Sequence, residues 1–400
     1  MSHAYIYDAG RTAFGRHGGA LSSVRPDDML AHVIKTLVNR NNFAPELYED
    51  VIAGSTNQAG EDSRNVARIA ALLAGLPIEC GGITVNRLCG SSLAAALDAS
   101  RCVKTNEGEL FVACGVESMS RAPLVLSKAS SAFDRGQEIF DTTMGARFTN
   151  PRIIAEYGGH AMPETADNIG SDLGITREES DIFAVQSQIK YEAARLADFF
   201  DDEIIPMEVS QGRKKPMLVV DKDEHPRPDS DLEKVAQLRS LFPEGIVTAA
   251  NASGINDGAS ALIIGSEKAG ENAGITPRAR ILAGAIVGVP PRVMGLGPVE
   301  ASKKALARAG LSLNDMDVME FNEAFAVQAL GCMKQLGIAF DDPRVNPNGG
   351  AIAIGHPLGA SGARIIMTAM RQLERTGGRY ALATMCIGIG QGIAVVIERV

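Results

Sequence analysis

Short runs of apolar and β-branched residues alternate with longer alanine-rich stretches along the first third of the chain. The short runs include residues 51–53, 83–85 and 110–113, and the longer stretches include residues 66–74 and 91–104. This strand-then-helix order predicts an α/β fold with a largely parallel sheet. The predicted strands are continuous apolar runs with little alternation, which is typical of a sheet covered on both faces.

A faint internal repeat predicts that the molecule has two related halves. A glycine and serine turn, a helix, a tight turn and an apolar strand follow one another in residues 90–114, and the same order recurs in residues 359–383. Between them, residues 121–242 are richer in charge, proline and irregular segments. We expect this middle segment to be an inserted domain or a set of long loops that supplies binding surface.

Composition and charge exclude several classes of protein. With 39 Lys and Arg against 48 Asp and Glu, the formal net charge is −9, so the chain as a whole has no electrostatic reason to bind nucleic acid or an anionic membrane. No stretch approaches the roughly 18 apolar residues that a membrane span needs. Residues 1–16 lack the pattern of a signal peptide, so we expect a cytoplasmic protein.

Six cysteines are too few for a disulfide framework in a chain of 400 residues, and no two of them form a Cys-x-x-Cys pair. Cys89 is the first candidate for chemistry, because it lies in the turn between a predicted strand and the predicted helix that starts at Ser91. Free N–H groups and the dipole at a helix start favour an anion. We therefore expect the pKa of this thiol to be lowered, which would make it a better nucleophile, although a buried structural cysteine is an equally simple interpretation.

His356 is the second candidate, in the glycine-rich segment 346–364. It is followed by a proline and flanked by glycines, just before a predicted helix, which is a typical way to present an imidazole base in a tight pocket. Two further candidate segments also follow predicted strands. Cys386 precedes three alternating glycines, and Asn322 and Glu323 come directly after the strand 318–321. Catalytic groups of open α/β sheets gather at such strand ends.

Taken together, these segments resemble the thiolase family over the whole chain. The residues that carry the resemblance are Asn86-Arg-Leu-Cys89, Gly115-Val-Glu-Ser-Met-Ser120, Asn251-Ala-Ser-Gly-Ile-Asn-Asp-Gly258, Asn322-Glu-Ala-Phe325, Gly355-His-Pro-Leu-Gly-Ala-Ser-Gly362 and Cys386-Ile-Gly388. The resemblance implies a five-layered αβαβα fold of two similar halves with an inserted loop domain. It places residues 1–120 with 243–270 in the N-terminal half, residues 121–242 in a CoA-binding loop domain, and residues 271–400 in the C-terminal half.

The resemblance also implies a role for each site residue. Cys89 would be the nucleophile that carries the acyl group, and His356 would take its proton and later that of the CoA thiol. Cys386 would protonate or deprotonate C2 of acetyl-CoA. Asn322 would hold a water that stabilises the enolate together with His356, and the N–H groups of Cys89 and Gly388 would form a second oxyanion hole.

For ligands and partners, the resemblance implies coenzyme A as a substrate, with Met162, Arg227 and Ser253 at positions where the family contacts it. It implies no metal, no redox cofactor, no nucleic acid and no membrane, and it implies a homodimer or homotetramer. Residues 58–68, 163–168 and 385–392 are most similar to the branch of the family that acts on 3-oxoadipyl-CoA.

Some positions depart from the common family pattern, and several alternatives stay open. Ser92, Ala250 and Ile389 stand where glycine is usual. Ser92 and Ile389 could narrow the pocket, which puts the acyl-chain preference in doubt. An acetoacetyl-CoA thiolase or a broader 3-ketoacyl-CoA thiolase is the nearest alternative. A ketoacyl synthase of the same fold class is another alternative, but such an enzyme uses a single cysteine, and the presence of Cys386 argues against it. A cysteine-histidine thioester hydrolase would release free acid without CoA, and a non-catalytic acyl-CoA carrier would not need the reactive groups.

Overall fold

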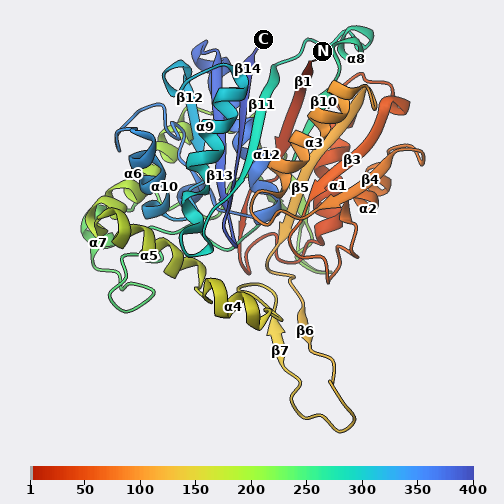
Figure 1. The fold of residues 1–400 in the computed structure, drawn as a ribbon. Helices are drawn as coiled ribbons and strands as arrows, with labels where there is room; N and C mark the ends of the chain where they lie inside the picture. The colour runs from red at the N-terminus through yellow and green to blue at the C-terminus, as the bar shows by residue number, and fades with distance from the viewer. Residues whose placement is uncertain (1–2) are drawn as a thin grey trace.

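A single large sheet organises the computed structural model, which describes residues 3–400 (Figure 1). Its order is β12-β13-β14-β11-β1-β10-β5-β3-β4, and the short strand β2 pairs with β10 beside this path. The strands are β1 (Ala4–Arg11), β2 (Gly15–Arg16), β3 (Tyr48–Gly54), β4 (Gly81–Val85), β5 (Leu110–Ser118), β10 (Asn256–Gly265), β11 (Ala279–Gly288), β12 (Val318–Phe321), β13 (Tyr380–Ile387) and β14 (Gln391–Arg399).

The prediction of a largely parallel sheet is wrong. Only β3 with β4, β3 with β5, and β12 with β13 run parallel, whereas the pairs along β13-β14-β11-β1-β10-β5 are antiparallel. Apolar runs predict that both faces of a strand are covered, and helices cover both faces of these antiparallel strands as well. A continuous apolar run therefore indicates that a strand is buried on both faces, but it does not indicate whether the strand runs parallel or antiparallel to its neighbours.

The two halves of the sheet have matching strand orders, as the internal repeat predicts. β4-β3-β5-β10-β1 on one side corresponds to β12-β13-β14-β11 on the other, and β1 pairs with β11 where the halves meet. The counterpart of β4 is reduced to one parallel bridge between Met319 and Val345. Two similar βα units thus form one continuous sheet.

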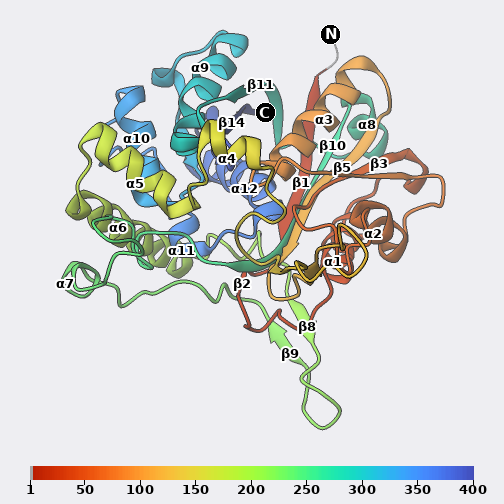
Figure 2. The ribbon, with the colours of Figure 1, turned by 60° about the horizontal axis from the view of Figure 1, so that its bottom comes forward.

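Helices divide the molecule into five layers, and the predicted αβαβα fold is confirmed. α3 and α12 lie in the middle and pack against both halves of the sheet, α1 and α2 cover the outer face of the N-terminal half, and α9 and α10 cover the outer face of the C-terminal half (Figures 1 and 2). These helices are α1 (Pro26–Asn39), α2 (Val66–Ala74), α3 (Ser91–Thr105), α9 (Gly297–Ala309), α10 (Ala326–Leu336) and α12 (Leu358–Thr376). Three apolar clusters fill the spaces between the layers.

The middle of the chain, between β5 and β10, contains short strands and helices; in Figure 1, α4 and the β6–β7 hairpin lie below the sheet, and α6 lies at the left beside α10. The hairpin of β6 and β7 projects from the molecule in Figure 1, and that of β8 and β9 projects in Figure 2. These elements are β6 (Leu124–Leu126), β7 (Ile139–Asp141), α4 (Pro151–Tyr157), α5 (Met162–Leu173), α6 (Arg177–Leu196), β8 (Met207–Val209), β9 (Leu218–Val220) and α7 (Leu232–Ala236). The remaining helices are α8 (Glu267–Ala273) and α11 (Ala351–Ile354).

A buried ion-pair network joins this middle segment to the sheet. The Arg11 guanidinium, on β1, lies 2.7 Å from Asp223 Oδ1 and 3.1 Å from Glu203 Oε2, and all three side chains are excluded from solvent. Removing Arg11 would leave two buried carboxylates without their counter-charge, so this contact anchors the segment strongly.

Close packing at the N-terminus of α12 positions the histidine loop. A Cβ atom at Gly359 would collide with the carbonyl oxygen of Val116 and would lie 2.6 Å from that of Gly54. A Cβ atom at Gly362 would collide with the backbone of Leu93. Because these two positions lack a side chain, α12 can begin directly against the ends of β3 and β5 and against α3.

Candidate active site

Cys89 lies in a tight turn between β4 and α3. Leu88, immediately before it, has a φ of +46°, which is uncommon for a residue with a side chain. The side chain of Asn86 accepts a hydrogen bond from the Leu88 N–H at 2.9 Å, and the Ser91 hydroxyl donates to the Leu88 carbonyl at 2.6 Å. These local bonds hold the strained backbone and fix the thiol at the start of the central helix.

The thiolate of Cys89 is hydrogen-bonded by the backbone N–H of Gly388 and by its own N–H, and both interactions lower its pKa. Burial acts more strongly in the opposite direction and raises the pKa of Cys89 to about 11, with a smaller contribution from the charge of Glu117. The expectation of a lowered pKa is therefore wrong for the free protein. A helix start in an apolar setting stabilises a thiolate less than water does.

The turn between β13 and β14 brings three segments together. A Cβ atom at Gly388 would lie 3.3 Å from Cδ1 of Leu88 and 3.6 Å from Sδ of Met162. The nucleophile turn, the glycine turn and the start of α5 therefore meet at Gly388, although they are far apart in the sequence.

Cys386 lies at the end of β13, where 1% of its surface is exposed. Burial raises its pKa well above the usual range of a thiol, and the negative charges of Cys89 and Cys332 raise it further. Cys386 stands two residues before Gly388, whose N–H is directed at the Cys89 sulfur, so the two thiols belong to neighbouring segments. Cys386 packs in an apolar cluster with residues such as Met294 and Phe325, so its neutral thiol is favoured.

His356 is buried at the entry to α12 and is contacted from both sides of its ring. Its Nε2 atom lies 3.3 Å from Nδ2 of Asn322, and its Nδ1 atom lies 2.6 Å from the hydroxyl of Ser361. Burial, together with the positive charge of Arg364, lowers the pKa of His356 to about 3. The imidazole is therefore neutral near pH 7, which is the form that accepts a proton.

Asn322 follows β12, and its backbone N–H donates to the carbonyl of Thr384 on β13 at 3.0 Å. This bond fixes the residue beside the strand that ends in Cys386. Its Oδ1 atom is buried and has no hydrogen-bond partner within residues 3–400. A buried amide oxygen without a partner is well suited to accept from a water or a substrate group.

Two buried carboxylates hold the loops of the site. The sequence singled out Glu323 beside Asn322 as a strand-end candidate, whereas Glu117 was quoted only within a family motif and was given no role. Glu117, at the end of β5, accepts backbone N–H groups from residues 56, 57 and 359 at 3.0–3.1 Å, and burial raises its pKa to about 7. Glu323 accepts from Ser187 and Asn346, both at 2.7 Å, and from the N–H of Ile352. In the sequence, Glu117 and Glu323 each stand as a charged residue at or just after the end of an otherwise apolar strand, and this pattern could have identified them as buried carboxylates with a structural role.

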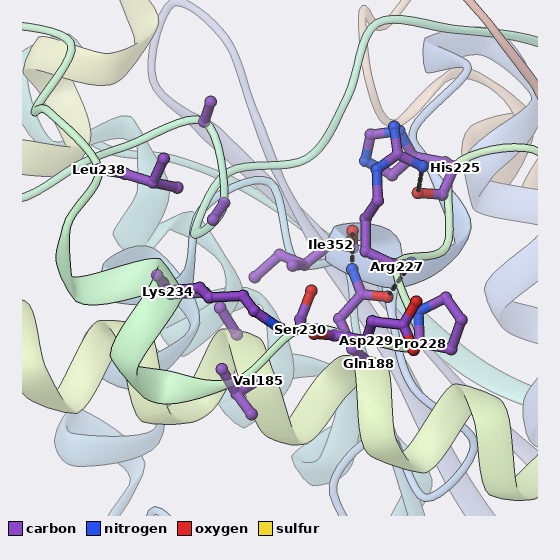
Figure 3. Close-up of a pocket in the computed structure, with 14 residues that line it drawn as sticks. Val185, Gln188, His225, Arg227, Pro228, Asp229, Ser230, Lys234, Leu238 and Ile352 are labelled. Atoms are coloured by element: carbon purple, nitrogen blue, oxygen red, sulfur yellow. Dashed lines mark hydrogen bonds between the residues drawn. The ribbon is translucent and has the colours of Figure 1, made fainter.

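The residues expected to contact CoA lie in different surroundings. Arg227 lines a cavity of about 530 Å³ together with Gln188, His225 and Lys234 (Figure 3). Met162 lies beside Gly388, and the N–H of Ser253 donates to the carbonyl of Ala324 at 2.9 Å. The described residues that line the cavity do not include Met162 or Ser253.

The cavity is connected to the histidine loop by hydrogen bonds. The Gln188 side chain accepts from the N–H of Arg227 at 2.8 Å and donates to the carbonyl of Ile352 at 3.2 Å, and both bonds are drawn in Figure 3. Ile352, on α11, lines the cavity four residues before His356. Arg227 supplies positive charge there, Lys234 pairs with Asp231 at 2.7 Å, and Asp229 adds a carboxylate. Val185 and Leu238 supply apolar surface, so the cavity offers both charged and apolar contacts to a ligand.

Across residues 3–400, no three His, Cys, Asp or Glu side chains are grouped so that they could hold a metal ion. Within the same range, the structure has no helix that is both long enough and apolar enough to cross a bilayer.

A thiol with two N–H donors, a second thiol and a neutral imidazole are groups that can together support acyl transfer through a thioester. The fold and this arrangement define an acyltransferase. The thiolase N-terminal domain model matches residues 4–268, and the thiolase C-terminal domain model matches residues 275–399. The chain therefore belongs to the thiolase family.

Relatives and solved structures agree with this assignment over the full length. The chain is 55% identical to a beta-ketoadipyl-CoA thiolase of Acinetobacter baylyi, with 100% of both chains covered. It is 54% identical to a 3-oxoadipyl-CoA/3-oxo-5,6-dehydrosuberyl-CoA thiolase of Escherichia coli, again with 100% of both covered. It is similar to the crystal structure of human mitochondrial 3-ketoacyl-CoA thiolase in complex with CoA, with a TM-score of 0.92, 39% identity and coverage of 100% and 98%.

Proposed function

We propose that this thiolase cleaves 3-oxoadipyl-CoA with CoA to give succinyl-CoA and acetyl-CoA, through an acyl intermediate on Cys89. The thiolytic chemistry rests on the convergence of Cys89, Gly388 and Cys386 around one site. The observation that carries the choice of substrate is the identity of 54–55%, over the full length, to relatives named for 3-oxoadipyl-CoA or beta-ketoadipyl-CoA.

In the first step, Nε2 of His356 takes the proton of the Cys89 thiol, and the sulfur attacks C3 of the substrate. The negative charge that forms on the C3 oxygen is stabilised by the N–H groups of Cys89 and Gly388. One such preorganised donor is worth about 3–4 kcal/mol of barrier. This step also accounts for a thiol with a raised pKa in the free enzyme, because a neighbouring base removes its proton only when substrate is bound.

In the second step, the C2–C3 bond breaks and its electron pair forms the enolate of acetyl-CoA. A water held by Asn322, together with His356, stabilises the enolate oxygen. The Cys386 thiol then donates its proton to C2, and acetyl-CoA leaves. A thiol with a raised pKa is better matched to a carbon acid than an ordinary thiol, because the two acidities differ less.

The third step regenerates the enzyme with all protons balanced. His356 gives the proton that it took from Cys89 to the Cys386 thiolate, which becomes a neutral thiol again. The imidazole, now neutral, then accepts the proton of the incoming CoA thiol. The CoA sulfur attacks the acyl group on Cys89, the bond to Cys89 breaks, and the departing thiolate recovers the proton from His356. No electrons are exchanged with a redox partner, so the reaction needs CoA as a substrate and no metal or redox cofactor.

We assign CoA binding to the loop domain of residues 121–242, assisted by Ser253 from the N-terminal half formed by residues 1–120 and 243–270. The cavity around Arg227 supplies charge for the nucleotide phosphates, and the side chain of Met162 lies beside Gly388, where the reactive end of CoA would arrive. Residues 271–400 form the C-terminal half, which carries His356 and Cys386.

We also propose that the protein is a cytoplasmic homodimer or homotetramer. The β6–β7 hairpin exposes large apolar side chains, and β4 leaves one side of the sheet unpaired. The most exposed of these side chains are Leu124, Leu126, Phe133 and Ile139. Exposed apolar surface and an open sheet edge favour contact with a second copy. Light scattering after gel filtration tests this, and a monomer at micromolar concentration would contradict it.

The direct test of the proposed function compares thiolysis of 3-oxoadipyl-CoA with thiolysis of acetoacetyl-CoA. We expect a higher kcat/KM for 3-oxoadipyl-CoA, measured as CoA-dependent loss of the keto-thioester. An equal or inverted preference would contradict the substrate and leave thiolysis intact. Release of free acid without CoA would indicate a hydrolase, and binding without turnover would indicate a carrier.

A further inference from the structure

Ser361 lies in the first turn of α12, five residues after His356, and its side chain is fully buried. Its Oγ atom is 2.6 Å from Nδ1 of His356 and 2.9 Å from the carbonyl oxygen of Pro357. The hydroxyl therefore touches the histidine ring on the side opposite to Asn322. The proposed mechanism uses Nε2 of this ring and assigns no role to Ser361.

The partners of the Ser361 hydroxyl determine where its proton lies. A hydroxyl has one proton to donate, and a backbone carbonyl can only accept. The Pro357 carbonyl already accepts the N–H groups of Ala360 and Ser361, and the hydroxyl lies 2.9 Å from it as a third donor. When the hydroxyl donates to this carbonyl, a lone pair of Oγ faces Nδ1 of His356, and Nδ1 is the donor of the 2.6 Å bond.

The other side of the ring leads to the same protonation state. A neutral imidazole carries one proton, so a proton on Nδ1 leaves Nε2 as an acceptor. The group that faces Nε2 is the Nδ2 amide of Asn322, which is a donor. All three bonds then run in one direction, from Asn322 to His356, from His356 to Ser361, and from Ser361 to Pro357.

We propose that Ser361 is a positioning residue that holds His356 in the tautomer with its proton on Nδ1. This inference rests on the proposed role of His356 as the base. The opposite tautomer places a proton on Nε2, where it opposes the Asn322 amide and prevents the ring from accepting the proton of Cys89. Ser361 thus keeps the acceptor nitrogen directed at the reaction.

The backbone around the ring is held firmly enough for one hydroxyl to select the tautomer. The N–H of His356 donates to Oδ1 of Asn256 at 2.9 Å, and the N–H of Gly359 donates to the Glu117 carboxylate at 3.0 Å. Gly355, with a φ of +107°, lies so close to Asn256 that a Cβ atom there would be 2.6 Å from the amide carbon. The ring therefore has little freedom to turn away and find a different partner for Nδ1.

The test is the Ser361→Ala variant, examined by nitrogen NMR of the histidine-labelled, full-length protein and by thiolysis kinetics. In the wild type, we expect the His356 proton on Nδ1, with the resonance assigned by its loss in His356→Ala. In Ser361→Ala, we expect a population with the proton on Nε2. General base catalysis contributes about 10²- to 10⁴-fold, so kcat should fall roughly tenfold or more while KM for CoA stays unchanged.

Ser260→Ala is the matched control. Ser260 is also buried, and its hydroxyl donates at 2.5 Å to the Ala360 carbonyl in the same turn of α12 rather than facing the imidazole. We expect this variant to keep both the Nδ1 tautomer and the wild-type kcat. Ser361→Thr retains the hydroxyl and should restore the Nδ1 tautomer and most of the lost kcat.

The outcomes separate this inference from the proposed function. If Ser361→Ala keeps the proton on Nδ1 and loses no activity, the role of Ser361 is wrong. If Ser260→Ala shifts the tautomer equally, the effect is a general one of helix packing, and the role of Ser361 is again wrong. If His356→Ala still acylates Cys89 and turns over normally, the proposed mechanism itself is wrong.

Discussion

The two halves of this molecule use the same arrangement of strands and helices to present different chemical groups. In the N-terminal half, the turn before the central helix α3 carries the thiol of Cys89. In the C-terminal half, the loop before the central helix α12 carries the imidazole of His356. Because α3 and α12 pack against each other between the two halves of the sheet, the duplicated architecture puts these two reactive groups at the starts of neighbouring helices.

A second pair of corresponding positions lies at the ends of β5 and β13. The N-terminal strand ends near Glu117, which binds three backbone N–H groups, and the C-terminal strand ends near Cys386, which packs in an apolar cluster. One position holds loops together, whereas the other presents a thiol. The difference shows that the fold provides the location and that the side chains and their surroundings determine what is done there.

The largest expected effect comes from removing the reactive group of the N-terminal half. Cys89→Ser should abolish acyl labelling of the enzyme and lower thiolysis by about 10⁴-fold or more, because the covalent step is lost. Intact-protein mass spectrometry after mixing with 3-oxoadipyl-CoA, together with the rate of thiolysis, measures both effects. Acyl labelling of another residue at the wild-type rate would contradict the assignment.

The corresponding change in the C-terminal half should separate the two steps of the reaction. Cys386→Ser should still be acylated at Cys89, but exchange of the C2 protons of acetyl-CoA with heavy water should fall by about 10²- to 10⁴-fold. Cys332→Ser is the control, because Cys332 is also buried near this site and donates to the Gly295 carbonyl at 3.1 Å. Wild-type exchange in Cys386→Ser would show that a different group moves the C2 proton.

The environment of Cys89 can be tested through its pKa of about 11. Below the pKa, the thiolate fraction rises about tenfold for each pH unit. The rate at which iodoacetamide alkylates Cys89 in the free enzyme should therefore keep rising from pH 7 to pH 10, as followed by peptide mapping. A plateau near pH 8 would instead show that the two N–H groups and the helix start outweigh burial.

The smallest of these effects is expected for Glu117, at the end of β5, which holds loops in place and takes no part in the proposed reaction. In Glu117→Gln, one acceptor oxygen becomes an NH₂ donor, which leaves buried N–H groups unpaired and costs about 1–3 kcal/mol. Urea unfolding at pH 8 should show this loss, and acylation of Cys89 should remain detectable. A variant as stable as the wild type would indicate that these backbone groups find other partners.

Much of the architecture could be predicted from the sequence, because its signals are local. Alternating apolar runs and alanine-rich stretches predicted strands and helices, and the repeat predicted two halves. Motifs at the strand ends singled out Cys89, His356, Cys386 and Asn322, and the structure places Asn322 against His356 and directs the N–H of Gly388 at the sulfur of Cys89. The direction of the strands was predicted wrongly, since a run that is buried on both faces has the same composition in either direction.

The tertiary structure alone decided how these groups interact. Only the packing of α3 and α12 between the two halves of the sheet determines that the N–H of Gly388 reaches the thiol of Cys89 and that Ser361 meets Nδ1 of His356. The pKa of Cys89 was misjudged for the same reason. A helix start is visible in the sequence, whereas desolvation depends on all the segments that fold around the sulfur, and the energy of a charge is set by that whole surrounding volume.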